Sequence, residues 1–136
     1  MSTNPIRKID HIGVAVRSVE EALTLWRDAF GLELLDVRDI PERGLRIAFL
    51  QLGEVMIELL APLHEGSQVS SFLEKRGEGI HHVCVEVGEI REKMAALTAA
   101  GIRVLADEPE IGAEGCPVAF LHPKSTRGVL LELIEK

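Results

Sequence analysis

Two histidines and two glutamates occupy equivalent places in this chain, and such side chains are typical ligands of divalent metal ions. His11 lies in "IDHIGVAV", and His82 lies 71 positions later (82 − 11) in the similar segment "IHHVCVEV". Glu58 and Glu132 lie 74 positions apart (132 − 58), in the matching segments "VMIELLAP" and "VLLELIEK". Together they would form a His2Glu2 site that leaves positions of a six-coordinate ion open for a substrate.

The elements that must position these side chains form a tandem repeat. Each histidine strand is followed by a helical pattern, "SVEEALTLWRDAF" from Ser18 and "EIREKMAALTAA" from Glu89. Ser18 is the expected N-cap of the first helix, and Glu21, three residues later, would complete a capping box. Gly31 and Gly101 follow the two helices and predict left-handed terminators.

Further apolar patterns complete the repeat. The apolar positions at helical spacing are Ala22, Leu25, Trp26 and Ala29 in the first helix and Met94, Leu97 and Thr98 in the second. Strands are predicted at 44–52, 55–62, 116–123 and 129–136. The chain therefore predicts an α+β fold in which two tandem βαβββ modules form a curved mixed sheet around a shared metal-binding cleft.

The whole chain, residues 1–136, is predicted to form a single domain of this kind. Module one spans about 6–63, a connector spans about 64–79, and module two spans about 80–136. The connector is polar and contains a short helix near Val69–Lys75.

Strand alternation places both histidines on the face that is not committed to helix packing. The small residues Gly13 and Ala15 share the face of His11, whereas the opposite face carries Ile12, Val14 and Val16. In the second copy the face of His82 also carries Cys84 and Glu86, and the predicted core face carries Val83, Val85 and Val87. Apolar neighbours also flank Glu58 and Glu132, and a carboxylate so placed is costly to bury without a proton or a cation.

Composition argues against several other classes. The net charge is −7, with no basic stripe and no tyrosine, which disfavours nucleic-acid binding. No apolar run is long enough to span a membrane, and "MSTNPIRKID" resembles neither a secretory leader nor a transit peptide, so a cytoplasmic location is expected. Cys84 and Cys116 form no CxxC pair, so reduced thiols are expected.

Longer segments resemble the vicinal oxygen chelate superfamily, which includes glyoxalase I, extradiol dioxygenases and bleomycin-resistance proteins, and more narrowly the methylmalonyl-CoA epimerase family. The segments are "KIDHIGVAV", "IELLAPL", "FLEKRGEGIHHVCVEV" and "DEPEIGAEGCPVAFLHPKSTRGVLLEL". The resemblance implies that His11, His82 and Glu132 are metal ligands, with Glu58 as the fourth. It implies one divalent ion, with Co2+ favoured and Mn2+, Ni2+, Zn2+ or Mg2+ as alternatives.

The resemblance also implies an isomerase that interconverts (2R)- and (2S)-methylmalonyl-CoA within propionyl-CoA and branched-chain catabolism. The C2 proton would leave and return through a metal-stabilised enolate, the partner would be a CoA thioester, and the assembly would be a homodimer. Glu132 is the expected catalytic acid/base. Some bacterial members carry a second glutamate where this chain has Ile47, so Glu58 or a metal-bound water would have to replace it.

Three further segments are candidates for substrate contacts. Lys124 and Ser125 in "HPKST" would bind the substrate carboxylate or a CoA phosphate, or else form an ordinary solvated turn. Gln51 would reach the cleft or face solvent, and the loop "GAEGCP" would act as a lid.

Two alternative functions stay open at this point. One is a glyoxalase I-like lyase acting on a glutathione hemithioacetal, which would use the same four ligand types. The other is a metal-free protein that sequesters a ligand, although such a protein would have no need of the four ligand residues.

Overall fold

The computed structural model describes residues 4–136, which divide into two units. The first unit comprises His11–His81, and the second comprises His82–Lys136 together with the N-terminal segment up to Asp10. The boundary therefore falls inside two strands, β1 (Lys8–Ala15) and β5 (Gly79–Val87). The first three residues, part of the segment considered for a leader, lie outside the described residues.

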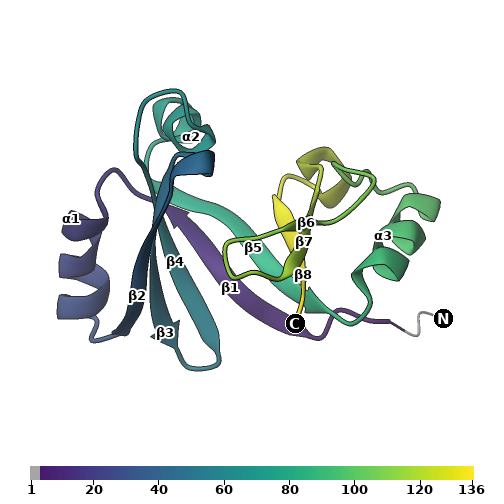
Figure 1. Ribbon diagram of the computed structural model, residues 1–136, viewed down its shortest axis with the longest axis horizontal. Helices are drawn as coiled ribbons and strands as arrows, with labels where there is room; N and C mark the ends of the chain where they lie inside the picture. The colour runs from purple at the N-terminus through teal and green to yellow at the C-terminus, as the bar shows by residue number, and fades with distance from the viewer. Residues whose placement is uncertain (1–3) are drawn as a thin grey trace. The chain divides into compact units, whose positions relative to one another are not determined.

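The first unit contains a mixed sheet with the strand order β2-β3-β4-β1. In this sheet β1 and β4 are parallel, whereas β3 is antiparallel to β4 and to β2. Helix α1 lies against one face of the sheet (Figure 1). After β1 the elements are α1 (Val19–Leu23), η1 (Thr24–Ala29), β2 (Glu33–Ile40), η2 (Pro41–Arg43), β3 (Leu45–Leu52), β4 (Val55–Pro62) and α2 (Gln68–Arg76).

The second unit repeats this arrangement with the strand order β5-β8-β7-β6. Its parallel pair is β5 and β8, and β7 is antiparallel to both β8 and β6. Helix α3 lies beside this sheet, as α1 does in the first unit (Figure 1). After β5 the elements are α3 (Ile90–Ala99), β6 (Glu110–Ile111), β7 (Pro117–Leu121), η3 (Pro123–Thr126) and β8 (Leu131–Glu135).

The prediction of two tandem βαβββ modules is confirmed, with one departure in the second module. There the segment that follows Gly101 contributes an isolated bridge between Val104 and Leu121, and β6 has two residues where β2 has eight. Pro109 precedes β6, lacks a backbone N–H and cannot donate to a strand ladder. The repeat is therefore least regular at its second strand.

Each unit has its own apolar core between its sheet and its helix, and the side chains come from the predicted strand faces. In the first unit the core consists of Val14, Val16, Val19, Leu23, Ala48, Leu50, Ile57, Leu59 and Ala61. In the second it consists of Val85, Val87, Ile90, Met94, Ala119, Leu121 and Leu133. Each large apolar side chain fully buried in this way contributes about 1.5–3 kcal/mol. Alternation thus identified the helix-facing side of both histidine strands correctly.

The first helix begins as predicted but widens in its second half. The Ser18 hydroxyl accepts a hydrogen bond from the Glu21 N–H at 3.2 Å, which confirms the N-cap. From Thr24 the helix continues as a π-helix, so the Phe30 N–H donates to the Leu25 carbonyl five residues earlier. The wider turn moves Ala29 out of the apolar face.

The two helical faces differ in detail from those predicted. In the first helix Val19 and Leu23 are buried, and the predicted apolar positions Ala22 and Trp26 pack against the same core. The other two predicted positions, Leu25 and Ala29, are exposed. In α3 Met94 is buried as predicted, whereas Thr98 is exposed and donates a hydrogen bond to the Met94 carbonyl.

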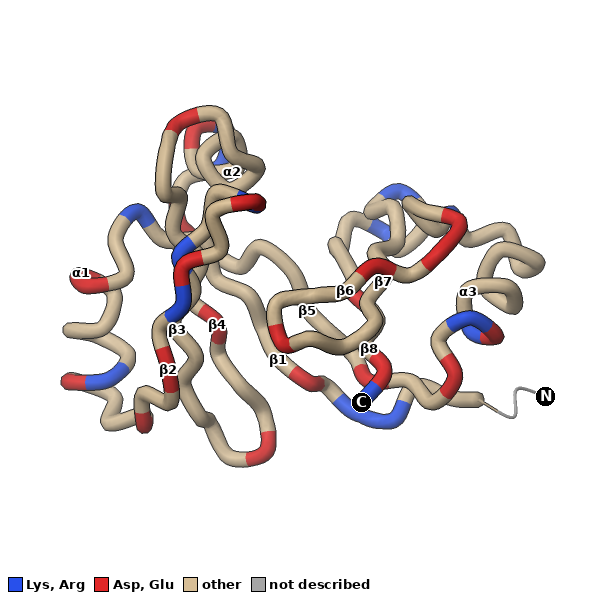
Figure 2. Tube along the Cα trace, in the orientation of Figure 1, with Lys and Arg blue, Asp and Glu red and all other residues tan. Residues whose placement is uncertain are grey.

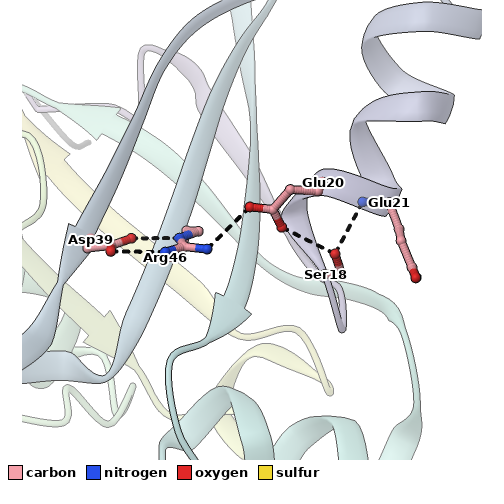
Figure 3. Close-up of polar contacts among 5 residues, drawn as sticks. All are labelled: Ser18, Glu20, Glu21, Asp39 and Arg46. Atoms are coloured by element: carbon pink, nitrogen blue, oxygen red, sulfur yellow. Dashed lines mark hydrogen bonds and ion pairs between the residues drawn. The ribbon is translucent and has the colours of Figure 1, made fainter.

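A network of hydrogen-bonded ion pairs connects α1 to the β2–β3 hairpin (Figure 3). Arg46 makes a bidentate contact with Asp39, with Nε–Oδ1 at 2.7 Å and Nη2–Oδ2 at 3.1 Å. Its Nη1 also donates to Glu20 in α1 at 3.2 Å. Hydrogen bonding to Arg46 lowers the pKa of the Asp39 carboxyl below its ordinary value. Acidic and basic residues alternate along this hairpin (Figure 2).

The N-terminal segment is built into the second unit although it comes first in the chain. The Arg7 N–H donates to the Glu86 carbonyl at 2.9 Å. The Asn4 side chain donates to the Glu89 carbonyl at 3.0 Å, and Lys93 Nζ donates to the Asn4 carbonyl at 2.8 Å. Residues 4–10 therefore complete the module that the chain forms last.

Candidate metal centre

In the first unit, the parallel pairing of β1 and β4 brings His11 to Glu58. Gly13 lies opposite Glu58 in this pairing, and His11 precedes Gly13 by two residues on the same face. His11 Nδ1 lies 3.1 Å from Glu58 Oε2. Both side chains are buried, with 4% and 5% of their surface exposed.

The second unit contains an equivalent pair. Cys84 lies opposite Glu132 in the parallel pairing of β5 and β8, and His82 precedes Cys84 by two residues. His82 Nε2 lies 3.1 Å from Glu132 Oε1, and both side chains are buried. The four residues predicted from the repeat therefore form two buried imidazole–carboxylate pairs, one in each unit.

A phenylalanine completes each pair on the third strand of its sheet. Phe49 lies opposite Glu58, and Phe120 lies opposite Glu132. The ring of Phe120 is also in edge contact with His82, with centroids 6.0 Å apart. These phenylalanines were missed in the sequence reading, although the repeated segment "AFL", at 48–50 and 119–121, has the same 71-position spacing (119 − 48) as the histidines.

The donor atoms fit a divalent cation. Ligands on neighbouring positions of a six-coordinate ion, each about 2.1 Å from the metal, lie roughly 3 Å apart. The 3.1 Å separations within the two pairs match this spacing. Imidazole nitrogen and carboxylate oxygen are also the donors that such ions prefer. Each pair is therefore suited to supply two ligands to a metal ion.

Position 47, considered from the sequence as the place of a second acid/base, is apolar here. Ile47 is buried on β3, opposite Leu60 and two residues from Phe49, on the same face as Glu58. Ile47 and Phe49, two β3 residues on the face of Glu58, are thus apolar, and β3 contains no carboxylate.

The structure also places the three predicted substrate-binding residues. Gln51 lies opposite Met56, which lies opposite His11, but its side-chain amide donates to the Gly53 carbonyl in the β3–β4 turn. Lys124 and Ser125 lie in η3, in the same unit as the His82–Glu132 pair. Lys124 is exposed.

A charged cluster near one of the candidate ligands was not foreseen. Lys136 Nζ lies 2.8 Å from Asp10 Oδ1 and 3.1 Å from Glu114 Oε1, in the loop "GAEGCP". Asp10 is buried and directly precedes His11. Burial acts to lower the pKa of Lys136, but hydrogen bonds from the ammonium group to the two carboxylates outweigh it and raise the pKa. Asp10 and Lys136 are too far apart in sequence for any local pattern to reveal this pairing.

The sequence is similar to a known superfamily and to named relatives. The model of the Glyoxalase/Bleomycin resistance protein/Dioxygenase superfamily matches residues 10–120. A relative from Cereibacter sphaeroides named ethylmalonyl-CoA/methylmalonyl-CoA epimerase is 45% identical over 130 residues, which cover 94% of this chain and 97% of the relative.

Solved structures show the same fold. A methylmalonyl-CoA epimerase from Mycobacterium tuberculosis is 31% identical, with a TM-score of 0.91 over 99% of this chain and 91% of that one. A methylmalonyl-CoA epimerase in complex with methylmalonyl-CoA and NH4+ is 35% identical, with a TM-score of 0.90 over 97% and 96%. The chain therefore belongs to the Glyoxalase/Bleomycin resistance protein/Dioxygenase superfamily and, within it, to the methylmalonyl-CoA epimerase family of isomerases.

Proposed function

We propose that this chain epimerises methylmalonyl-CoA at C2 and that His11, Glu58, His82 and Glu132 together hold one divalent ion for that reaction. The observation that carries the proposal is the pair of equivalent, buried imidazole–carboxylate contacts in a chain of the epimerase family. A related epimerase has been solved with methylmalonyl-CoA bound, which supports this choice of substrate. Co2+ is the favoured ion, as the family resemblance implies.

The chemistry requires a proton to leave C2 and return on the opposite face. A divalent ion at these ligands would supply positive charge that stabilises the negative charge developing on the substrate oxygens. Glu132 is the proposed acid/base, because a carboxylate oxygen can take up the C2 proton and return it. Phe120, opposite Glu132, and the buried strand face around it help to exclude water from that carboxylate.

The second acid/base is proposed to be Glu58. It is the equivalent residue of the first unit, it is buried, and Ile47 leaves β3 without a carboxylate. Equivalent carboxylates in two repeated modules are suited to the opposite faces of one planar carbon, because each face then meets its own proton carrier.

The proposed substrate class is a CoA thioester of a 2-alkylmalonate. The relative from Cereibacter sphaeroides is named for both ethylmalonyl-CoA and methylmalonyl-CoA, so both thioesters belong in the assay. The thioester and carboxylate oxygens belong to the two carbonyl carbons that flank C2, and such a site would bind them together.

Hydrogen exchange tests the proposal directly. The metal-free protein is reloaded with Co2+ and incubated with methylmalonyl-CoA in D2O, and deuterium at C2 is followed by mass spectrometry. We expect incorporation that depends on protein and metal, with one metal ion bound per chain. Absence of exchange, with turnover of a glutathione hemithioacetal instead, would identify a glyoxalase I-like lyase. If the protein binds no metal, the result would favour a ligand-sequestering role.

A homodimer is proposed from the family resemblance, and a cytoplasmic location is proposed as the sequence patterns predict. Within residues 4–136, no helix combines the length and apolarity needed to cross a membrane. Light scattering coupled to size exclusion measures the mass of the assembly, and fractionation of the source cells locates the protein.

A further inference from the structure

Hydrogen bonds within the turn between β7 and β8, and from it to a separate segment, define its conformation. Within it, the Lys124 N–H donates to His122 Nδ1 at 3.0 Å. Arg103, on a separate segment, is joined to this turn twice. Its N–H donates to the Ser125 hydroxyl at 3.0 Å, and its carbonyl accepts from the His122 N–H at 2.8 Å. The backbone of Arg103 is therefore hydrogen-bonded to the η3 turn at two points.

The η3 turn and the segment bonded to it carry three cationic residues, Arg103, Lys124 and Arg127. We call this group of residues the basic turn. All three are exposed, and none of them forms an ion pair within residues 4–136. The surrounding sequence has no carboxylate, since residues 115–131 and 94–106 contain neither aspartate nor glutamate. Basic segments are visible on the turn that follows β7 (Figure 2).

These cations stand out because the rest of the chain is acidic. The net charge is −7, and most other basic side chains contact a carboxylate or a carbonyl. Examples are Arg27 with Asp28, Arg91 with Glu108, and Lys93 with the Asn4 carbonyl. A group of cations without carboxylate partners is suited to an anionic ligand.

The backbone of Arg127 supports a role for its side chain. Arg127 has φ of +59°, and it is the one non-glycine residue with positive φ between residues 4 and 136. An L-residue in this region costs about 1 kcal/mol relative to glycine. Arginine thus occupies a position where glycine would be relaxed, which points to a requirement for the guanidinium group.

We propose that the basic turn binds phosphate groups of the CoA portion of the substrate, an inference that rests on the proposed function. The turn leads directly into β8, and Glu132 follows Arg127 by five residues, at most about 18 Å along an extended chain. The extended pantetheine arm of CoA bridges a separation of this size between thioester and phosphates. Arg127 and Lys124 donate to phosphate oxygens, and Arg103 adds a third positive charge.

The test compares Arg127→Gly with wild type on three thioesters: methylmalonyl-CoA, methylmalonyl-dephospho-CoA and methylmalonyl-pantetheine. Arg127→Gly removes the cation and relaxes the backbone, so it should fold at least as well as wild type. With methylmalonyl-CoA we expect KM to rise about tenfold, with kcat within twofold, since one charge-assisted hydrogen bond is lost. Arg127→Lys should restore most of the affinity, because the charge returns.

The shortened substrates identify the phosphate. If the KM effect of Arg127→Gly disappears with the dephospho substrate, the turn binds the 3′-phosphate. If it persists there but disappears with the pantetheine thioester, the turn binds the pyrophosphate. The proposal would be overturned if Arg127→Gly raised KM for the pantetheine thioester as much as for methylmalonyl-CoA. It would also be overturned if Arg127→Gly left KM for methylmalonyl-CoA unchanged.

Two controls complete the design. Arg27→Gln removes a positive charge from η1, in the helical layer that covers the sheet face opposite His11 and Glu58, and should leave KM unchanged. Calorimetric titration with free CoA measures the subsite without catalysis. If the wild type binds CoA more tightly than Arg127→Gly but catalyses no exchange, the phosphate subsite stands and the epimerase proposal fails.

Discussion

Lys136 forms an ion pair with Asp10, with 2.8 Å between Nζ and Oδ1, and so joins the strand of one candidate metal ligand to the strand of another. Asp10 directly precedes His11 in β1, and Lys136 follows the strand that carries Glu132. The same ammonium group also contacts Glu114 in the loop beside β7. One lysine side chain thus fixes two strand ends and a loop within the second unit.

Replacing Lys136 by methionine should weaken both the fold and metal binding. The free energy of unfolding should fall by about 1–2 kcal/mol, because the buried Asp10 carboxylate loses its cation. The loss should not be larger, because Lys136 is partly exposed and solvent screens the ion pair. The Kd for Co2+ should rise, because the backbone next to His11 is held less firmly. Chemical denaturation and titration with Co2+ measure the two effects, and Lys136→Arg should retain both properties. Equal stability and equal Kd in Lys136→Met and wild type would contradict this role.

The same ion pair predicts how stability responds to alkali. The pKa of Lys136 is raised in the folded state, so its contribution is complete below the ordinary lysine pKa of 10.5. The contribution is lost as the pH rises through the higher, folded-state pKa. The stability difference between wild type and Lys136→Met should therefore stay constant from pH 7 to about pH 10 and shrink only above it. Thermal melts over this range provide the measurement.

Glu132→Gln should abolish most of the exchange at C2 while the protein stays folded. The amide keeps the shape of the side chain but cannot accept the proton, and loss of such a group typically costs about 10²–10⁴-fold. Mass spectrometry of deuterium at C2 measures the rate, and circular dichroism checks the fold. Glu33→Gln, on the exposed strand β2, is the matched control and should be fully active. Full activity of Glu132→Gln would remove this residue from its proposed role.

Asp39→Asn should lower stability at neutral pH and lose its effect in acid. Arg46 lowers the pKa of the Asp39 carboxyl, so this contribution is present above the ordinary pKa and is lost as the pH falls through the lower, folded-state value. The melting temperatures of wild type and Asp39→Asn should thus differ at pH 7 and converge below about pH 3. Asp107→Asn, in an exposed loop, should behave like wild type at both pH values.

Two glycines with the same backbone conformation should respond differently to alanine. Gly44 and Gly53 have φ of +66° and +61°. A Cβ at Gly53 meets no neighbour, so Gly53→Ala should cost about 1 kcal/mol for the left-handed backbone alone. A Cβ at Gly44 would lie 2.9 Å from the His64 ring and 3.1 Å from Ser67 Cβ, and should cost about 1 kcal/mol more. Equal losses in urea denaturation would show that His64 and Ser67 move aside without penalty.

Local patterns were sufficient to predict the parts of the site that depend on one strand at a time. Alternation requires only an extended backbone, so the faces of His11 and His82 followed from the sequence. The repeat then indicated two glutamates at equivalent positions, and the structure pairs each of them with the histidine of its own module. The pairs His11–Glu58 and His82–Glu132 are the result.

Features that depend on distant segments could not be obtained in this way. The contact between Lys136 and Asp10 joins residues at opposite ends of the chain, and no periodicity connects them. The exposure of Leu25 and Ala29 was not predicted, because a regular helical spacing does not reveal the π-helix from Thr24 to Ala29. The positive φ of Arg127 had no signal either, since residue type alone favours glycine there.

The N-terminal segment belongs to the second unit, and this has a consequence for biosynthesis. Asn4, Arg7 and Asp10 are translated before their partners Glu89, Glu86 and Lys136, which follow about 80 to 130 residues later. Until then His11–His81 can form its own sheet and core, but the strand that carries His11 stays unfinished at its leading end. A nascent chain arrested before residue 82 should therefore expose that end to chaperones and proteases, and only translation of the last strands would bury it.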